Sequence, residues 1–159
     1  MQILNNFNTT VEKALSEIDP HWRRYKGLIV CGTHSPTDVE QMLVLIREAR
    51  ESGLPFLGIC AGYQLASIEY ARGVLGIPDA TSEEFMVEGT LVVKKRPELK
   101  VGLHEGETWW SNYEVVIDPV FPENFFTVPF HPEYQSSVDK PHPLLVEFLN
   151  YAKGYTNDI

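Results

Sequence analysis

The residue best placed for chemistry is Cys60, which stands between two glycines in the pattern G-x-C-x-G over residues 58–62. The apolar run before Cys60 is typical of a buried strand and the run after it of a helix, as in a nucleophile elbow with sulfur in place of hydroxyl. Such a turn strains the backbone of the nucleophile, and Gly58 and Gly62 remove Cβ atoms that would clash with the neighbouring strand and helix. The helix dipole then favours the thiolate, and the N–H of Ala61 would face a developing oxyanion. Taken alone, the pattern also fits an inert buried cysteine.

A thiolate nucleophile needs a base, and the segment FHPEYQSS (130–137) contains one. His131 follows an apolar strand and is separated from Glu133 by a single proline. In an extended chain, residues two apart point to the same side, so Glu133 is predicted to hold the ring of His131 in one tautomer. Cys60, His131 and Glu133 are therefore candidates for a Cys-His-Glu catalytic system.

The elements that must position these residues alternate between strand and helix in the first half of the chain. Strands are expected at 27–32 and 54–60, and helices at 8–19, 35–53 and 61–76. Thr9 with Glu12, and Thr37 with Glu40, have the capping-box spacing of helix starts. The second half is richer in strands, expected at 86–95, 112–118 and 124–130, with a closing helix at 142–154. This order predicts an α/β fold with a parallel sheet covered by helices and a strand-rich C-terminal half.

The composition is that of an ordinary soluble globular protein. The chain has 159 residues, 43% hydrophobic and 22% charged, which predicts one domain over 1–159. The formal charge of −9 disfavours binding to nucleic acid or to anionic membrane surfaces. No apolar run reaches the roughly 18 residues of a membrane span, and no signal peptide is recognised. The two cysteines, Cys31 and Cys60, are too few for a disulfide scaffold or a metal cluster, so we expect reduced thiols and a cytoplasmic location.

Several sequence blocks together resemble one known family. The blocks PFLGICAGYQ and FHPEYQSS, followed by KPHPL, resemble the class I glutamine amidotransferase domain, and most closely that of CTP synthase and its small stand-alone relatives. The blocks ATSEEF and NYEV lie between them in the order of the family. The resemblance runs, with gaps, from about residue 27 to 150. It implies a three-layer, flavodoxin-like fold.

The activity that the resemblance implies is amide hydrolysis through a thioester. Cys60 would attack the side-chain carboxamide of glutamine, with His131 moving the proton and Glu133 orienting the imidazole. Ammonia would leave, and water would then release glutamate. Gly32 matches the first glycine of the family's oxyanion loop, so its N–H would act together with that of Ala61.

The resemblance also implies a set of substrate-binding residues. Gln64 falls on a pocket position of the family. Glu84 matches the carboxylate that holds the α-ammonium group of the substrate in the CTP synthase pattern. The other predicted substrate-binding residues are Thr33, Asn112 and Tyr113. No cofactor and no metal ion are expected.

Two departures from the family pattern concern the grip on free glutamine. The oxyanion loop of the family resembles P-G-G-F-G, whereas this sequence has C-G-T-H-S, so Thr33 adds a side chain close to the substrate. In the segment TWWSNYEV, Asn112 replaces the arginine that would bind the α-carboxylate of the substrate. Losing such a charge-assisted pair costs about 1.5–3 kcal/mol. This pattern suits a substrate whose α-carboxylate is masked or absent, with an aromatic or apolar group near Trp109 and Trp110. Ordinary packing of the two tryptophans is the alternative.

The chain is short for the family. The first strand and helix are compressed into residues 1–18, and the region between Glu84 and Asn112 is abridged. No synthetase domain is recognised, so any ammonia released would go either to water or to a separate partner, such as an ammonia-accepting synthetase. An exposed sheet edge left by the compression would favour a homodimer.

Three functional hypotheses fit these observations. The first is a cysteine-dependent amidohydrolase or amidotransferase subunit, favoured because Cys60, His131 and Glu133 are all present. The second is a catalytically degenerate domain that binds a metabolite or a protein partner, favoured by the changes at Thr33 and Asn112. The third, a thiol-based redox or chaperone-like protein, gives the H-P-E block no role and ranks last.

Overall fold

The computed structural model describes residues 1–5, 10–32, 38–85, 88–95 and 113–155. Its helices are α1 (Thr10–Ile18), α2 (Val39–Ser52), α3 (Ala61–Gly73) and α4 (Pro143–Gly154), with 3-10 turns η1 (Trp22–Arg24), η2 (Glu83–Phe85) and η3 (Pro132–Gln135). Its strands are β1 (Gln2–Leu4), β2 (Leu28–Val30), β3 (Phe56–Ile59), β4 (Ala80–Ser82), β5 (Thr90–Lys95), β6 (Tyr113–Val115) and β7 (Phe125–Val128). Among the described helices, none combines the length and apolarity that a membrane crossing needs.

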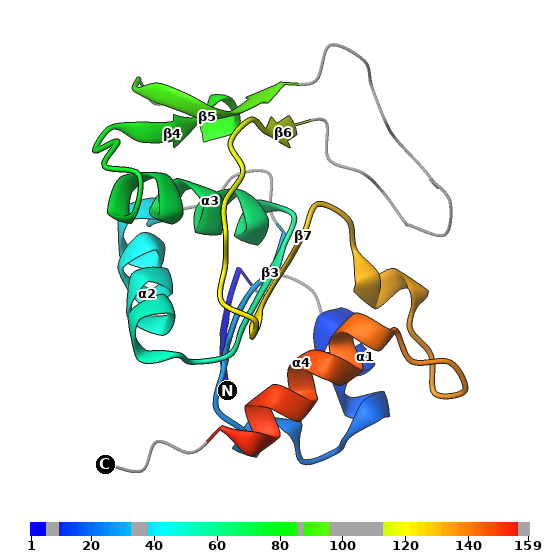
Figure 1. Ribbon diagram of the computed structural model, residues 1–159. Coiled ribbons are helices and arrows are strands. Elements are labelled where there is room, and N and C mark those ends of the chain that lie inside the picture. The colour runs from blue at the N-terminus through cyan, green and yellow to red at the C-terminus, as the bar shows by residue number, and fades with distance from the viewer. Residues whose placement is uncertain (6–9, 33–37, 86–87, 96–112, 156–159) are drawn as a thin grey trace.

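The main sheet is parallel and has the strand order β1-β2-β3-β7. Its side chains alternate between two apolar layers, as the period of two in a strand requires. Leu28 and Val30 of β2 pack with α2 and α3, whereas Ile29 between them packs with α1 and α4. Figure 1 shows the two pairs of helices on opposite sides of the sheet. The predicted three-layer α/β arrangement is therefore confirmed.

Helix α1 covers one face of the sheet through the apolar stripe that its sequence predicts. Val11, Ala14 and Leu15 are buried, and Ile18, the fourth predicted position, is half-buried. The stripe packs against α4, whose start is capped by His142: its Nδ1 accepts a hydrogen bond from the backbone N–H of Leu144 at 3.2 Å. The layer formed by α1 and α4 supports the turn η3, because η3 contacts both helices.

A second, smaller sheet lies beyond α3 and has the order β4-β5-β6 (Figure 1). β4 and β5 are parallel, and β5 and β6 are antiparallel. The strands β5, β6 and β7 confirm the predicted strand-rich second half, but β4 was not predicted. Helix α3 contacts strands of both sheets, so it is the element that fixes the small sheet relative to the main one.

Several helix ends differ from the predicted ones. The helix predicted at 35–53 is observed as α2 from Val39 to Ser52, and the preceding Asp38 has φ 55° and makes no side-chain cap bond. The proposed capping residues Thr9 and Thr37 lie outside the described residues. α3 ends at Gly73 instead of Gly76, which adopts a φ of 72° in the turn that follows.

Candidate active site

Cys60 occupies the sharp joint between β3 and α3, and its backbone is strained. Its φ is 55° and its ψ is −101°, a region that non-glycine residues rarely adopt. Glycine is required at positions 58 and 62 because neighbouring backbone atoms approach both positions closely. A Cβ on Gly58 would lie 2.8 Å from the carbonyl carbon of Gly62, and one on Gly62 would lie 2.2 Å from the carbonyl oxygen of Val30. The structure therefore confirms the predicted elbow geometry.

The parallel pairing of β3 with β7 brings His131 to the same sheet edge as Cys60. Ile59 pairs with Val128, and the N–H of Cys60 donates to the carbonyl oxygen of Val128 at 2.9 Å. His131 follows three residues after Val128. Because both strands run in the same direction, their carboxyl ends deliver the thiol and the imidazole to one place.

Glu133 holds the imidazole of His131 through a hydrogen bond. Nδ1–H of His131 donates to Oε1 of Glu133 at 2.9 Å, and the side chain of Glu133 is only 2% exposed. The predicted contact between Glu133 and His131 is present, but the extended conformation that was expected to produce it is not. The pair does not lie in an extended strand: Pro132 begins the 3-10 turn η3, and the turn brings the carboxylate back to the ring.

The electrostatic surroundings of His131 favour its protonated form. Burial lowers the pKa of His131, but the hydrogen bonds with Cys60 and Glu133 and the charges of both outweigh burial and raise this pKa to about 9. At neutral pH the imidazole is therefore a cation, held between Cys60 and Glu133. We call Cys60, His131, Glu133, Gly32 and Ala61 the nucleophile end of the site.

Gly32 directly flanks the thiol and the imidazole. A Cβ on Gly32 would lie 2.8 Å from Cε1 of His131 and 3.2 Å from Cβ of Cys60. Ala61 is the first residue of α3 and is fully buried. The N–H groups in the first turn of a helix have no intrahelical acceptor, so that of Ala61 has none within α3.

Gln64, one turn into α3, belongs to a hydrogen-bonded network that reaches the small sheet. Its side-chain Nε2 donates to Oε2 of Glu84 at 2.7 Å, and its Oε1 accepts from the hydroxyl of Ser82 at 3.0 Å. The Ser82 hydroxyl in turn accepts from the N–H of Glu84 at 3.2 Å. Burial raises the pKa of Tyr113 on β6, and the charges of Glu84 and Glu83 add to the rise, so Tyr113 lies near the same carboxylates. We call Gln64, Ser82, Glu84 and Tyr113 the pocket end of the site.

Ser82 is the site residue that sequence reasoning missed. It is fully buried on β4, and its only sequence signal was its place in the block ATSEEF. Burial, followed by the charges of Glu133 and Glu12, raises the pKa of the Cys31 thiol to about 12, so this thiol is a poor candidate for a nucleophile. Four residues of the sequence interpretation lie outside the described residues: Thr33, Asn112, Trp109 and Trp110.

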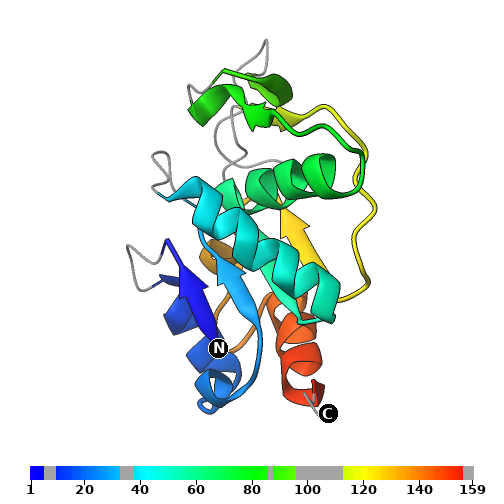
Figure 2. The same cartoon turned by 90° about the vertical axis from the view of Figure 1, so that its left-hand side faces the viewer.

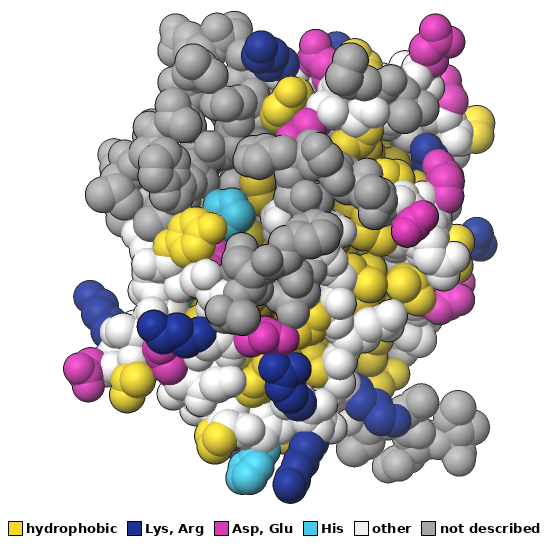
Figure 3. All heavy atoms as spheres, turned by 180° about the vertical axis from the view of Figure 1, so that it is seen from behind, with side chains coloured by type: hydrophobic (Ala, Val, Ile, Leu, Met, Phe, Trp, Pro, Cys, Tyr) yellow, Lys and Arg dark blue, Asp and Glu magenta, His cyan; other side chains and the backbone are white. Residues whose placement is uncertain are grey.

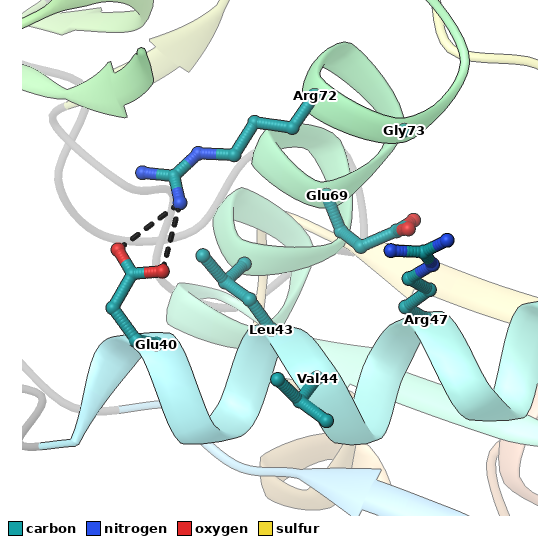
Figure 4. A pocket seen from close by; sticks show the side chains of 7 residues that line it. All are labelled: Glu40, Leu43, Val44, Arg47, Glu69, Arg72 and Gly73. Atoms are coloured by element: carbon teal, nitrogen blue, oxygen red, sulfur yellow. Dashed lines mark hydrogen bonds and ion pairs between the residues drawn. The ribbon is translucent and has the colours of Figure 1, made fainter. Parts of the chain in front are cut away.

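A groove between α2 and α3 lies apart from this site (Figure 4). It has a volume of about 190 Å³ and contains none of the predicted site residues. Its charged groups are paired: Arg72 with Glu40 at 2.9 Å, and Glu69 with Arg50 at 2.7 Å. Such pairs hold α2 against α3, and we assign the groove no ligand.

The surface charges form no continuous basic field on the face shown in Figure 3, as far as the described side chains go. Acidic and basic side chains are interspersed there, with hydrophobic side chains between them. Within the described residues, no group of three or more His, Cys, Asp or Glu side chains is arranged to hold a metal ion.

Comparison with known proteins identifies the family of the chain. Residues 3–125 match the family model described as glutamine amidotransferase class-I. The protein therefore belongs to the class I glutamine amidotransferase family. The matched span includes Cys60 and Gln64, and it ends before His131 and Glu133.

Relatives among well-described proteins are CTP synthases. The enzyme of Thermomicrobium roseum is 31% identical over 92% of this chain and 36% of its own length. That of Methanoregula boonei is 49% identical over 46% of this chain and 14% of its own. The chain thus spans about a third or less of these relatives. The first alignment extends over 200 positions although the chain has 159 residues, which agrees with an abridged domain.

A solved structure shares the fold. The glutaminase domain of Trypanosoma brucei CTP synthase, described with bound acivicin, superposes with a TM-score of 0.75. The superposition covers 97% of this chain and 90% of that one at 21% sequence identity. The predicted resemblance to the CTP synthase glutaminase domain is confirmed.

Proposed function

We propose that the protein is a cysteine-dependent amide hydrolase that releases ammonia from glutamine or a related γ-glutamyl carboxamide. The observation that carries the proposal is the strained, positive-φ Cys60 at a strand–helix joint, beside the hydrogen-bonded pair of His131 and Glu133. Membership of the class I glutamine amidotransferase family supports the same reaction.

In the first proposed step, the sulfur of Cys60 donates an electron pair to the carboxamide carbon, and a C–S bond and an oxyanion form. The protonated His131 then gives its proton to the amide nitrogen, the C–N bond breaks, and ammonia leaves. A thioester on Cys60 and a neutral imidazole remain. The pKa of about 9 for His131 supports its role as the proton donor at neutral pH.

In the second step, the neutral imidazole of His131 takes a proton from water, whose oxygen attacks the thioester carbon. The C–S bond breaks with its electron pair on sulfur, the carboxylic acid product leaves, and the thiolate–imidazolium pair is restored. Glu133 keeps Nδ1 protonated throughout. The N–H groups of Gly32 and Ala61 are the proposed oxyanion donors, and one such donor is typically worth about 10²–10³-fold in rate.

The pocket end is the proposed binding site for the amino-acid part of the substrate. Glu84 would bind the α-ammonium group, and Gln64 would line the path to Cys60. The bond between Gln64 and Glu84 supports this, because it fixes the carboxylate one helical turn from the nucleophile. Thr33 and Asn112 belong to the same proposal, in which substrates with a masked α-carboxylate are accepted beside glutamine.

We further propose that residues 1–159 form one domain and that the ammonia acceptor is a synthetase unit outside them. The names of the relatives support this acceptor, because the relatives are CTP synthases and the similar solved structure is described as the glutaminase domain of one. The position of β1 at the edge of the main sheet (Figure 2) supports the proposed homodimer, which size-exclusion chromatography tests.

The test of the proposed function is ammonia release from glutamine and from its α-methyl ester. We expect activity with wild type, at least a thousandfold loss with Cys60→Ala, and near wild-type activity with Cys31→Ala, which removes the buried second thiol. An ester turned over as well as glutamine would support the altered clamp. A Cys60→Ala variant as active as wild type would refute the reaction. Binding of glutamine without turnover would favour the degenerate binding domain instead.

A further inference from the structure

The ring of Tyr134 lies flat on the ring of His131. The two centroids are 4.9 Å apart and the rings are inclined by only 19°. Tyr134 belongs to the turn η3, and its backbone N–H donates to the carbonyl oxygen of His131 at 3.2 Å. Because the turn starts directly after His131, the ring is held over the imidazole by backbone geometry as well as by its own contact.

The imidazole of His131 is thus enclosed on several sides. Glu133 holds Nδ1, and the backbone of Gly32 limits the edge with Cε1 and Nε2, where a Cβ would lie 2.8 and 3.5 Å away. Tyr134 covers one face of the ring. Tyr134 itself is 46% exposed, so its outer face borders solvent.

Tyr134 lies close to the ionisable groups that also surround the imidazole of His131. Burial raises the pKa of the Tyr134 phenol, and the charges of Glu133 and Cys60 raise it further, so the phenol lies near both of these residues. Across η3, Lys13 and Glu17 of α1 line a cavity of about 280 Å³ together with Glu133 and Tyr134.

Two further titratable groups face Glu133. Cys31, at the end of β2, has its pKa raised by burial and then by the charge of Glu133. His142, at the start of α4, has its pKa lowered by burial, and the charge of Glu133 opposes that effect. Neither group covers the ring face of His131 as Tyr134 does. The negative face of an aromatic ring attracts a cation lying over it.

We propose that Tyr134 is a positioning residue: its ring is the platform on which the His131 imidazolium lies, and it favours the charged ring over the neutral one. The inference rests on the proposed function, in which the imidazolium supplies the proton to the leaving ammonia. Simple hydrophobic cover is the alternative, and a leucine would supply that cover without a π face.

The test compares Tyr134→Phe with Tyr134→Leu. The pH titration of His131 is followed by NMR in protein labelled at histidine, with the signal assigned through His131→Gln and the exposed His21 as internal reference. We expect Tyr134→Phe to titrate like wild type. The midpoint of His131 in Tyr134→Leu should lie about 0.4–0.7 pH units lower.

Equal midpoints for wild type and Tyr134→Leu would overturn the proposal, and so would a Tyr134→Phe variant that behaves like Tyr134→Leu. The titration needs no substrate. If wild type fails to hydrolyse glutamine, the proposed function fails while the platform is still tested. Tyr151→Leu, which removes a ring that packs on Phe126 of β7, is the matched control for loss of a partly exposed aromatic contact.

Discussion

The nucleophile end and the pocket end of the site are held in different ways. At the nucleophile end, Cys60 and His131 are placed by backbone: an elbow, two parallel strands and a 3-10 turn. At the pocket end, Gln64 and Glu84 are placed by side-chain hydrogen bonds that link α3 to a second sheet. Backbone geometry depends on short, local patterns, whereas the network depends on partners about 20 residues apart. We therefore expect mutations at the two ends to fail in different ways.

Among the variants that compare the two ends, the largest effect is expected for Gly32→Ala, which tests the nucleophile end. The new Cβ would collide with Cε1 of His131, and a small displacement of a catalytic group can cost about a hundredfold in kcat/KM. The fold should persist. Gly62→Ala should instead destabilise the fold, because its Cβ would press on the carbonyl oxygen of Val30. Gly154→Ala, with nothing within 4 Å, is the control for both activity and thermal unfolding.

The second prediction concerns the pH dependence of stability. The pKa of His131 is raised from 6.5 in the unfolded chain to about 9 in the folded one. Its interactions therefore stabilise the fold fully below about pH 6.5 and are lost as the pH rises from 6.5 through 9, by at most about 3 kcal/mol. Urea unfolding from pH 6 to 10 should show this decline in wild type. A decline of the same size in His131→Gln would contradict the assignment.

The third prediction tests the pocket end through Ser82→Ala. The substitution removes two hydrogen bonds of the Ser82 hydroxyl, one to Oε1 of Gln64 and one from the backbone N–H of Glu84. We expect KM for glutamine to rise about tenfold with kcat within about twofold. Ser67→Ala is the matched control: Ser67 lies on α3, is fully buried like Ser82, and among the described residues its hydroxyl donates to the carbonyl oxygen of Tyr63. A fall in kcat with an unchanged KM would show that the two ends are not separate.

The smallest effect is expected at Arg72, which ties the pocket end to the rest of the fold. Its Nε donates to the carbonyl oxygen of Ala80 on β4 at 2.9 Å, and its Nη1 pairs with the exposed Glu40 (Figure 4). Arg72→Gln should raise KM about twofold, because β4 loses one anchor. Glu40→Gln should leave KM unchanged and should change the free energy of unfolding by no more than about 0.5 kcal/mol. Equal effects of the two variants would argue against positioning through β4.

The nucleophile end could be predicted from the sequence because its signals are local. G-x-C-x-G marked the elbow at Cys60, and H-P-E marked the pair of His131 and Glu133. Even there the predicted local conformation was wrong. The spacing of two between His131 and Glu133 predicts an extended chain, whereas Pro132 starts a 3-10 turn. Proline at the first position of a turn was the overlooked signal.

The pocket end could be predicted only in part. Gln64 and Glu84 were named from the resemblance, but nothing in the sequence indicated that they bond to each other. β4 is three residues long and too short to show alternation, so Ser82 could not be placed on a strand. Its position depends on pairing with β5, a non-local contact that single-sequence patterns do not report.

The most direct test of the central claim is intact-protein mass after incubation with acivicin, with iodoacetamide as the unselective control. We predict one adduct at Cys60, prevented by excess glutamine, absent in Cys60→Ser and strongly reduced in His131→Ala. Cys31, buried and with a raised pKa, should stay unlabelled. Labelling of Cys60 by iodoacetamide but not by acivicin would indicate a reactive thiol with a different substrate. No adduct at Cys60 with either reagent would contradict the account, because it would mean that the elbow cysteine is an inert thiol.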